Sequence, residues 1–392
     1  MENLRIGIIG VGNIGSAHAS CLLSGKIVGA KLTAICDIKE SRLLHYAKYL
    51  PEVEGFSDYK EMIASGRVDA VIVSVPHPSH ADIASYCLSH GVHVLVEKPE
   101  DIRVSKAKAL NEVAKNSGKV FAIMFNQRTN PLFIKAKEIV SEGKLGELKR
   151  VNWNITNWYR TQFYYDSGDW RATWNGEGGG VLLNQAPHNL DLWQWICGMP
   201  VEITAFCDEA KYHNIEVEDD VTIFARYANG ATGTFITSTG ELPGTNRLEI
   251  CGDLGKIVLE NNSLKWWRLK ESERKTCFEA KNSFIEADLE YEEIISNDSG
   301  SAHAGIIQNF VNSIFFGEDL IANGYEGVNE LTISNAAYLS SWLGNVKISL
   351  PMDEALYDKL LEERANESES AKKGASESPI RTKYSERWQV KF

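Results

Sequence analysis

Two separate segments of the 392-residue chain carry side chains able to exchange a proton at a carbon–oxygen bond. The first segment holds Lys98, in Glu97-Lys98-Pro99, directly after a β-branched run at 92–96. An ammonium at a strand end can bind a substrate hydroxyl and stabilise negative charge on its oxygen. The second segment holds His188, whose imidazole titrates near neutral pH and can accept a hydroxyl proton. Taken singly, Lys98 is equally well explained by an ion pair with Glu97, and His188 by a core histidine.

A glycine-rich turn near the N-terminus predicts a dinucleotide site. The sequence Gly10-Val11-Gly12-Asn13-Ile14-Gly15 follows a predicted strand at 4–9 and opens a predicted helix. In such a motif the first glycine permits a tight turn, the second lets a pyrophosphate approach the backbone, and the third lets helix and strand pack closely. The helix N-terminus adds N–H donors and partial positive charge. We therefore expect cofactor contacts from Gly10, Gly12, Asn13, Ile14 and Gly15.

Asp37 indicates which dinucleotide binds. It ends the second predicted strand, 22 residues after Gly15, where a carboxylate can accept hydrogen bonds from both hydroxyls of the adenosine ribose. Its negative charge would repel the 2′-phosphate of NADP, so the sequence favours NAD, although Lys39 and Arg42 soften that repulsion. The alternative role for Asp37 is that of a helix N-cap.

The elements needed to position these groups alternate in the N-terminal part of the chain. Apolar, β-branched runs at 4–9, 31–36, 70–75, 92–96 and 120–125 are typical of strands, and segments at 16–23, 40–49, 79–88 and 104–116 show helical spacing. This alternation predicts an α/β fold, a Rossmann doubly wound parallel sheet with right-handed crossovers. We expect this dinucleotide-binding domain to occupy residues 1–128.

The pattern changes near residue 145. Predicted strands at 148–158, 201–207, 220–227, 231–239, 247–251 and 256–260 are joined by turns, and predicted helices lie at 189–197, 306–314 and 330–346. These elements predict an α+β domain with a large, mainly antiparallel sheet at 129–358. The polar residues from 359 to 392 are predicted to form a flexible tail or an arm that docks on a neighbouring surface.

Composition narrows the classes of function. The formal charge is 41 minus 53, or −12, which disfavours a nucleic-acid or anionic-membrane surface built on net positive charge. No apolar stretch approaches the roughly 20 residues of a membrane span, and no metal-ligand set is apparent. Seven scattered cysteines without a CxxC pair favour reduced thiols. We therefore expect a cytoplasmic protein.

The motifs together resemble the Gfo/Idh/MocA family of NAD(P)-dependent oxidoreductases, named for glucose-fructose oxidoreductase and inositol dehydrogenase. Besides the glycine turn and Glu97-Lys98-Pro99, the segment 75–80 (VPHPSH) is similar to the family's TPNxxH turn, with Val75 and His77 departing from it. The resemblance covers roughly residues 4 to 350. It implies cofactor contacts near the nicotinamide from Pro76, His77, His80, Glu97, Lys98 and Asn126.

The second-domain motif, residues 178–192 (GGGVLLNQAPHNLDL), is similar to the family's GGGxxxDxGxHxxD. The resemblance implies that Lys98 and His188 form the acid–base pair. Asn184 stands where the family has Asp; an amide can orient a hydroxyl but cannot raise the basicity of His188. The chain then either works with a less basic histidine or uses a neighbouring carboxylate, for which Asp191 is a candidate; the alternative for Asp191 is helix packing.

Aromatic residues around this motif indicate the substrate class. Six of the ten tryptophans lie between 153 and 195: Trp153, Trp158, Trp170, Trp174, Trp193 and Trp195. Flat aromatic faces pack against the C–H faces of a sugar or cyclic polyol, although any one tryptophan is as well explained by core packing. The predicted substrate contacts are Lys98, Arg128, Trp158, Arg160, Trp170, Arg171, Trp174, Asn184 and His188.

These residues predict an NAD-dependent dehydrogenase acting on a secondary ring hydroxyl of a sugar, glycoside or inositol-like polyol. One alternative is an NAD-recycling glycosidase that acts by transient oxidation at C3 followed by elimination. Another, from a different class, is a non-catalytic NAD-binding sensor, which retention of both Lys98 and His188 disfavours. The family resemblance further implies that the domain at 129–358 serves substrate binding and oligomerisation, and that the protein is a homodimer or homotetramer.

Overall fold

The structure is a computed structural model that describes residues 3–168 and 170–368. The chain divides into two compact units, of which the first contains Met1–Thr129 and Gly300–Leu331 and the second Asn130–Ser299 and Thr332–Phe392. The predicted domain at 1–128 differs from the first unit mainly by the segment 300–331. Of the predicted arm at 359–392, residues 369–392 lie outside the described residues.

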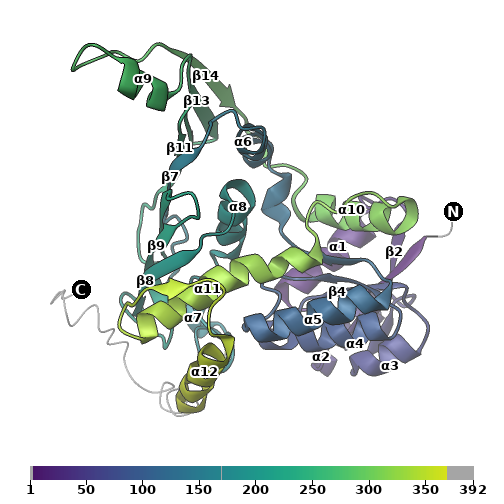
Figure 1. Ribbon diagram of the computed structural model, residues 1–392. Helices are drawn as coiled ribbons and strands as arrows, with labels where there is room; N and C mark the ends of the chain where they lie inside the picture. Colours follow the sequence, from purple (N-terminus) through teal and green to yellow (C-terminus); the bar gives the residue numbers. More distant parts are fainter. Residues whose placement is uncertain (1–2, 169, 369–392) are drawn as a thin grey trace. The chain divides into compact units, whose positions relative to one another are not determined.

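The first unit contains a six-stranded sheet in the order β3-β2-β1-β4-β5-β6, parallel throughout. Figure 1 shows it with its helices α1 to α5 and α10. Because the strand order reverses between β1 and β4, the carboxyl ends of these strands form the switch point at which such sheets bind ligands. This confirms the predicted Rossmann fold. The strands are β1 (Leu4–Ile9), β2 (Ala30–Cys36), β3 (Glu54–Phe56), β4 (Ala70–Val73), β5 (His93–Val96) and β6 (Phe121–Ile123).

The helices of this unit explain why residues 300–331 belong to it. Ile307 and Phe310 of α10 are fully buried in the same hydrophobic core as the strands. Helical spacing had predicted a helix at 306–314, but spacing does not say which core an apolar face joins. The helices are α1 (Asn13–Leu23), α2 (Glu40–Tyr49), α3 (Tyr59–Ala64), α4 (His80–Ser89), α5 (Val104–Ser117) and α10 (Ala302–Phe316).

The second unit is built on a nine-stranded sheet in the order β14-β13-β12-β11-β7-β10-β9-β8-β15. Only the β7–β10 pair is parallel, so the predicted mainly antiparallel sheet is confirmed. Strands β13 to β15 were not predicted. The strands are β7 (Leu148–Ile155), β8 (Glu202–Glu209), β9 (Glu218–Arg226), β10 (Thr232–Ser238), β11 (Asn246–Gly252), β12 (Gly255–Glu260), β13 (Ser263–Leu269), β14 (Leu289–Ile295) and β15 (Ile348–Ser349).

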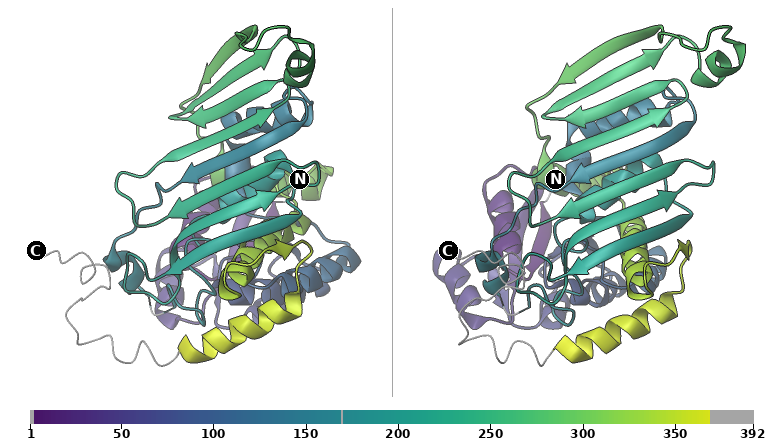
Figure 2. Two further views of the ribbon diagram at one scale, coloured as in Figure 1. Left: turned by 60° about the vertical axis from the view of Figure 1, so that its left-hand side comes forward. Right: turned by 90° about the vertical axis from the view of Figure 1, so that its left-hand side faces the viewer.

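Helices α6 (Pro131–Ser141) and α8 (Pro187–Cys197) cover one face of this sheet, which Figure 2 shows in two further views. Aromatic packing fixes α8 on the sheet: the Trp193 ring stacks on Phe235 of β10 at 5.4 Å between centroids, and Trp153 of β7 meets Phe235 edge-on. The other face exposes Phe206 and Phe224. The remaining helices are α7 (Gln162–Asp166), α9 (Glu273–Glu279), α11 (Gly327–Trp342) and α12 (Glu354–Ser368).

Two negative findings apply to the residues that the structure describes. No helix among them combines the length and apolar character needed to span a bilayer. No three His, Cys, Asp or Glu side chains among them gather as metal ligands would.

Two buried carboxyl groups, Glu100 and Asp101, follow the end of β5. Asp101 Oδ1 accepts hydrogen bonds from the backbone N–H groups of Ile102, at 2.8 Å, and Arg103, at 3.0 Å. Burial nevertheless raises the pKa of Asp101 to about 7. Burial, together with the charges of Asp101 and Glu330, raises the pKa of Glu100 well above its usual value. The folded chain therefore holds these protons more tightly than the unfolded chain does.

This raised pKa gives folding a pH dependence of known sign. Since the folded state binds the extra proton, stability is fully present below the unfolded pKa and is lost as the pH rises. For Asp101 we expect a loss of at most about 1.4 kcal/mol per pH unit between about pH 4 and about pH 7. Asp101→Asn keeps the acceptor oxygen and should remove this part of the slope in urea unfolding. The exposed N-cap change Asp58→Asn serves as control. Equal pH slopes for wild type and Asp101→Asn would contradict the assignment.

Candidate active site

The turn between β1 and α1 contains three glycines, and the packing of the protein itself requires glycine at two of these positions. Gly10 has a φ of +88°, and a Cβ there would lie 2.6 Å from the carbonyl oxygen of Ser74. A Cβ at Gly15 would come within 1.9 Å of the Gly10 carbonyl oxygen. At Gly12 the nearest atom to such a Cβ is Arg42 Nη1, 3.8 Å away. The fold does not need glycine at position 12, whereas a pyrophosphate approaching the backbone does.

Asp37 lies directly after β2 and is buried beside this turn. Its Oδ2 accepts hydrogen bonds from Val11 N at 3.0 Å and Arg42 Nη1 at 2.8 Å, and its Oδ1 accepts one from Lys39 N at 2.9 Å. The N-cap of α2 is Lys39, so the N-cap alternative for Asp37 is wrong. Carboxylate oxygens can accept further donors, so ribose hydroxyls fit this group. The residues present therefore suit a dinucleotide, and Arg42 neutralises part of the charge that would repel a 2′-phosphate.

Lys98 is the one side chain of residues 94–102 that is not buried. Its backbone N–H donates to Glu97 Oε2 at 3.2 Å, while Glu97 Oε1 lies 2.7 Å from His18 Nε2. Burial alone would raise the pKa of Glu97, but the His18 hydrogen bond and the charges of His18, Lys98 and His303 bring it to about 2. Glu97 is thus a buried anion that fixes the strand end beneath Lys98.

The turn after β4 is tied to the turn after β5 through His80. Its two ring nitrogens each lie 2.7 Å from a backbone carbonyl oxygen, one of Val75 and one of Pro99. Burial lowers the pKa of His80, although both carbonyls counteract the effect. His77 is also buried, whereas Pro76 is exposed. Of these three predicted cofactor contacts, His80 supports the backbone, His77 is buried with its ring 5.8 Å from that of His80, and Pro76 lies at the surface.

Asn126 follows β6 and has a neighbour that sequence reasoning missed. Asn126 Nδ2 lies 3.2 Å from Nδ1 of His303, which belongs to α10. The His303 ring is 5.5 Å from the His18 ring, and burial lowers its pKa. Nothing in the local sequence relates His303 to Asn126, because 177 residues separate them.

In the second unit, the triple glycine packs against a buried carboxyl group, that of Glu218, whose pKa burial raises to about 8. A Cβ at Gly180 would lie 2.0 Å from the carbonyl oxygen of Glu218, and one at Gly179 would lie 2.2 Å from Tyr338 Oη. The Glu218 side chain accepts hydrogen bonds from Gly180 N and Leu182 N, both at 2.9 Å, and from Tyr338 Oη at 2.8 Å. Sequence reasoning missed Glu218 because it opens the charged run 218–220, a pattern typical of a solvated surface.

Residues 177–194, which contain the turn and most of α8, leave two side chains partly exposed. Among residues 177–194, every side chain except those of Asn184 and His188 is buried. Asn184 lies in the turn before α8, and His188 lies in the first turn of α8, whose opposite side is anchored by Trp193. The two residues singled out for chemistry are therefore the two that an external molecule can reach on this segment.

Asn184 is held by polar neighbours. Its Nδ2 donates to Glu177 Oε1, and its Oδ1 lies 3.5 Å from Tyr164 Oη. The Tyr164 hydroxyl in turn accepts from Arg171 Nη1 at 2.8 Å and from Gln185 Nε2 at 3.3 Å. Glu177 and Gln185 were not predicted; the only signal was their position, Glu177 directly before the motif at 178–192 and Gln185 within it.

Asp191, the carboxylate considered as a partner for His188, is buried and accepts a hydrogen bond from Gln194 Nε2 at 3.0 Å. Both residues belong to α8 and lie three positions apart, so this contact is internal to the helix. The geometry favours the packing alternative for Asp191.

Burial in other interactions disfavours two of the predicted substrate contacts, Trp174 and Arg128. The Trp174 ring is 5% exposed and packs against Tyr338 and Trp342 with centroids 5.5 and 5.4 Å away. The Arg128 side chain, in the first unit, is 1% exposed, pairs with Glu326 and donates to the carbonyl oxygen of Ile321. Core packing likewise explains Trp153 and Trp193.

Trp158, Arg160, Trp170 and Arg171 are partly exposed, as a ligand contact requires. Trp158 Nε1 donates to Asn189 Oδ1 at 3.1 Å, and the Arg171 guanidinium lies 4.6 Å from the Trp170 ring centroid. These four residues stay predicted substrate contacts.

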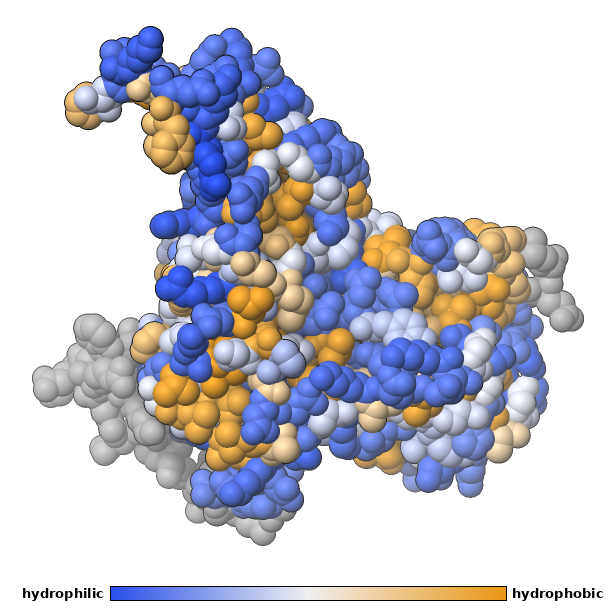
Figure 3. Space-filling model, viewed as in Figure 1, coloured by the Kyte–Doolittle hydropathy of each residue, from blue (hydrophilic) through white to orange (hydrophobic). Residues whose placement is uncertain are grey.

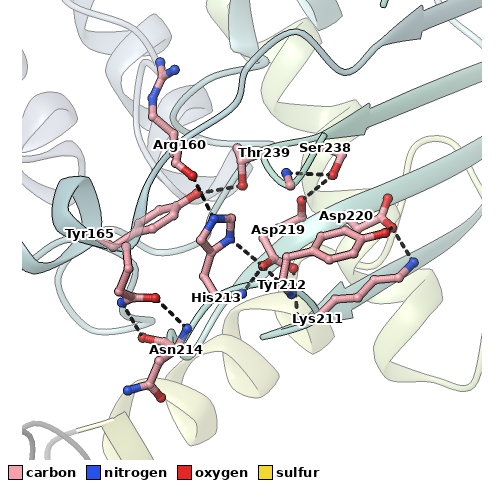
Figure 4. A network of polar contacts seen from close by, with 12 residues as sticks. Arg160, Tyr165, Lys211, Tyr212, His213, Asn214, Asp219, Asp220, Ser238 and Thr239 are labelled. Carbon is pink, nitrogen blue, oxygen red and sulfur yellow. Dashed lines mark hydrogen bonds and ion pairs between the residues drawn. The ribbon is translucent and has the colours of Figure 1, made fainter. Parts of the chain in front are cut away.

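A polar network fixes the loop that carries Arg160. The His213 ring bridges Asp219 Oδ2 and the Arg160 carbonyl oxygen, each at 2.8 Å, and Tyr165 Oη lies 2.8 Å from Thr239 Oγ1. Figure 4 shows the Arg160 guanidinium directed away from this network. The loop backbone is therefore anchored, while the guanidinium donates hydrogen bonds to the carbonyl oxygens of Trp158, at 3.2 Å, and Tyr159, at 2.9 Å.

Comparisons with known proteins agree with this geometry. Residues 4–125 match the oxidoreductase family with an NAD-binding Rossmann fold, and residues 133–258 match the GFO/IDH/MocA C-terminal domain. The chain is 29% identical to myo-inositol 2-dehydrogenase of Thermotoga maritima over 66% of this chain and 75% of that protein. It is 26% identical to the NAD(+)-dependent scyllo-inositol 2-dehydrogenase of Bacillus subtilis, over 66% and 74%.

A solved structure is similar as well. The WlbA dehydrogenase from Bordetella pertussis, in complex with NADH and UDP-GlcNAcA, gives a TM-score of 0.76 at 25% identity, covering 90% of this chain and 100% of that one. Fold, glycine turn and comparisons define an NAD-binding oxidoreductase of the sugar and inositol dehydrogenase type. The chain belongs to the Gfo/Idh/MocA family.

The glycine geometry predicts opposite effects for two alanine substitutions. Gly15→Ala forces a clash with the Gly10 carbonyl and should lower the thermal midpoint clearly. Gly12→Ala meets no protein atom within 3.8 Å and should leave the midpoint unchanged while weakening NAD binding at least about tenfold. Calorimetry and NAD titration separate the two effects. NAD affinity preserved in Gly12→Ala would contradict the placement of the pyrophosphate.

Proposed function

We propose that the protein is an NAD-dependent dehydrogenase that oxidises a secondary ring hydroxyl of a sugar, glycoside or inositol-like polyol to a ketone, or runs in reverse. The observation that supports it most is the pattern of exposure. In each of two motifs, buried residues surround the side chains proposed to act on the substrate: Lys98 in 94–102, and Asn184 and His188 in 177–194. The named relatives act on inositols, which supports this substrate class.

Each residue has a distinct role in this proposal. Bound NAD supplies the acceptor for the hydride. Lys98 binds the reacting oxygen and stabilises the negative charge that develops on it. His188 takes the hydroxyl proton, and Asn184 orients the ring through a neighbouring hydroxyl. Residues 1–128 serve as the dinucleotide-binding domain and residues 129–358 supply the substrate contacts, with Trp158, Arg160, Trp170 and Arg171 lining the sugar.

The test is a screen of NAD reduction with inositols, glucose and glucosides, followed by variants. His188→Ala and Lys98→Met should each lower turnover of the best substrate at least about 10²-fold, with NAD binding kept. His90→Ala, a change at an exposed histidine, is the control. Unchanged turnover in His188→Ala would overturn its assignment. Cleavage of a glycoside without net NADH would instead favour the NAD-recycling glycosidase, and no hydride transfer to any sugar would favour the sensor.

We also propose a homodimer or homotetramer formed through the open face of the nine-stranded sheet. Phe206 of β8 is 54% exposed and Phe224 of the neighbouring β9 is 38% exposed on this face. Figure 3 shows further hydrophobic surface near α9, where Phe278 and Phe284 are exposed. An apolar patch of this kind is typical of an interface.

Light scattering on the purified chain tests the assembly. We expect a mass two or four times that of the 43.7 kDa chain. Phe206→Ser with Phe224→Ser should shift it toward one chain, because two apolar contacts are lost. A wild-type monomer would rule the proposal out.

We place the protein in a reducing compartment, the cytoplasm. All seven cysteines are free thiols. Burial raises the pKa of Cys36 and of Cys87 to about 12, so both resist oxidation as thiols.

A further inference from the structure

Asn184 and its polar neighbours form a series of hydrogen bonds in which donors and acceptors follow one another in a fixed direction. It runs from the Arg171 guanidinium through the Tyr164 hydroxyl and the Asn184 carboxamide to the Glu177 carboxylate. A guanidinium only donates hydrogen bonds, and a carboxylate only accepts them. The two groups in the middle can each do both, so the ends decide their orientation.

Glu177, the last acceptor in this series of hydrogen bonds, is held rigidly. Its side chain is 2% exposed, and its Oε2 accepts a hydrogen bond from Ala172 N at 2.6 Å. Ala172 has a φ of +52°, a conformation that disfavours non-glycine residues, so the carboxylate holds a strained turn in place. The backbone N–H groups of Glu177 and Gly178 both donate to the Thr173 carbonyl oxygen, at 3.0 and 3.1 Å. The carboxylate therefore has little freedom to move.

The orientation of the Asn184 amide follows from these partners. The Glu177 carboxylate can accept a hydrogen bond only from Nδ2 of Asn184, so Oδ1 of Asn184 lies on the side of Tyr164. Tyr164 already accepts from Arg171 at 2.8 Å, so its own proton is free to go to Oδ1. At 3.5 Å that contact is the longest of these hydrogen bonds, and a carboxamide oxygen has two lone pairs, so Oδ1 is able to accept from a substrate hydroxyl besides Tyr164.

We propose that Glu177 is a positioning residue that locks the Asn184 carboxamide with Oδ1 directed to the substrate, so that the site selects a ring hydroxyl acting as a donor. The inference rests on the proposed dehydrogenase and deepens it. The negative charge that the family motif has at position 184 is present here at position 177, behind a neutral acceptor. The exposed group thus binds a hydroxyl without itself carrying charge.

A reciprocal pair of substitutions tests this. Glu177→Gln replaces an obligate acceptor with an amide that can turn, and Asn184→Asp places two carboxylates in contact. Each should lower kcat/KM of the best substrate at least about tenfold. In the double variant, the amide introduced at position 177 donates to the carboxylate introduced at position 184, so the contact is restored with donor and acceptor exchanged. We expect it to recover most of the thermal midpoint and at least about tenfold in kcat/KM over Asn184→Asp.

The pH profile separates positioning from mere stability. In the double variant the charge has moved to the exposed position on the same segment as His188, so the acid limb of kcat/KM should move up by about one pH unit. Glu241→Gln, at an exposed glutamate, is the matched control and should change nothing. If Glu177→Gln folds poorly, Tyr164→Phe keeps the ring contacts with Arg160 and Arg171, removes only the hydroxyl, and should raise KM.

The outcomes distinguish this inference from the dehydrogenase proposal. Glu177→Gln with a lower midpoint and unchanged kcat/KM shows a structural role only and overturns the inference. Additive losses in the double variant, in midpoint as well as in kcat/KM, also overturn it. If wild type reduces NAD with no sugar or polyol, the dehydrogenase proposal fails. Rescue of the midpoint in the double variant would then still establish the Glu177–Asn184 contact, and failure of that rescue would overturn it.

Discussion

The close approach of the triple-glycine turn to Glu218 is the constraint on which the second unit's candidate site depends. The Glu218 carboxyl group accepts hydrogen bonds from two backbone N–H groups of the turn and from the hydroxyl of Tyr338. The backbone carbonyl oxygen of Glu218 occupies the space that a Cβ at Gly180 would need. An unmade hydrogen bond at a buried carboxylate costs about 1–3 kcal/mol or more, so the turn has one favourable geometry. That geometry determines where α8 begins and which two side chains of the segment reach solvent.

In the first unit, too, buried polar side chains hold the turns that carry a candidate site residue. Glu97 is buried under Lys98 and is held by His18, and His80 joins the backbone after β4 to that after β5. In both units a buried polar group orders a turn, and one or two neighbouring side chains are left accessible.

Much of this was accessible from the sequence, because periodicity and glycine spacing are local. The Rossmann order, the mainly antiparallel sheet and the family followed from residues close together in the chain. Strand β14 was missed because its side chains are largely exposed and charged, so no apolar alternation marks it. Glu218 and Asp219 were missed for the opposite reason. A run of acidic residues is expected at the surface, yet both side chains are fully buried and accept hydrogen bonds from backbone N–H groups. Long-range neighbours such as His303 and Asn126 leave no local pattern at all.

The path of the chain has a consequence for how this protein can be divided. It passes from one unit to the other after Thr129, returns at Gly300, and leaves again after Leu331. A fragment ending at Thr129 would lack Ile307, Phe310 and Val311, three apolar side chains of its own core. A single cut in the gene therefore cannot separate the nucleotide-binding unit from the rest, because its core is complete only when residues 300–331 are present as well.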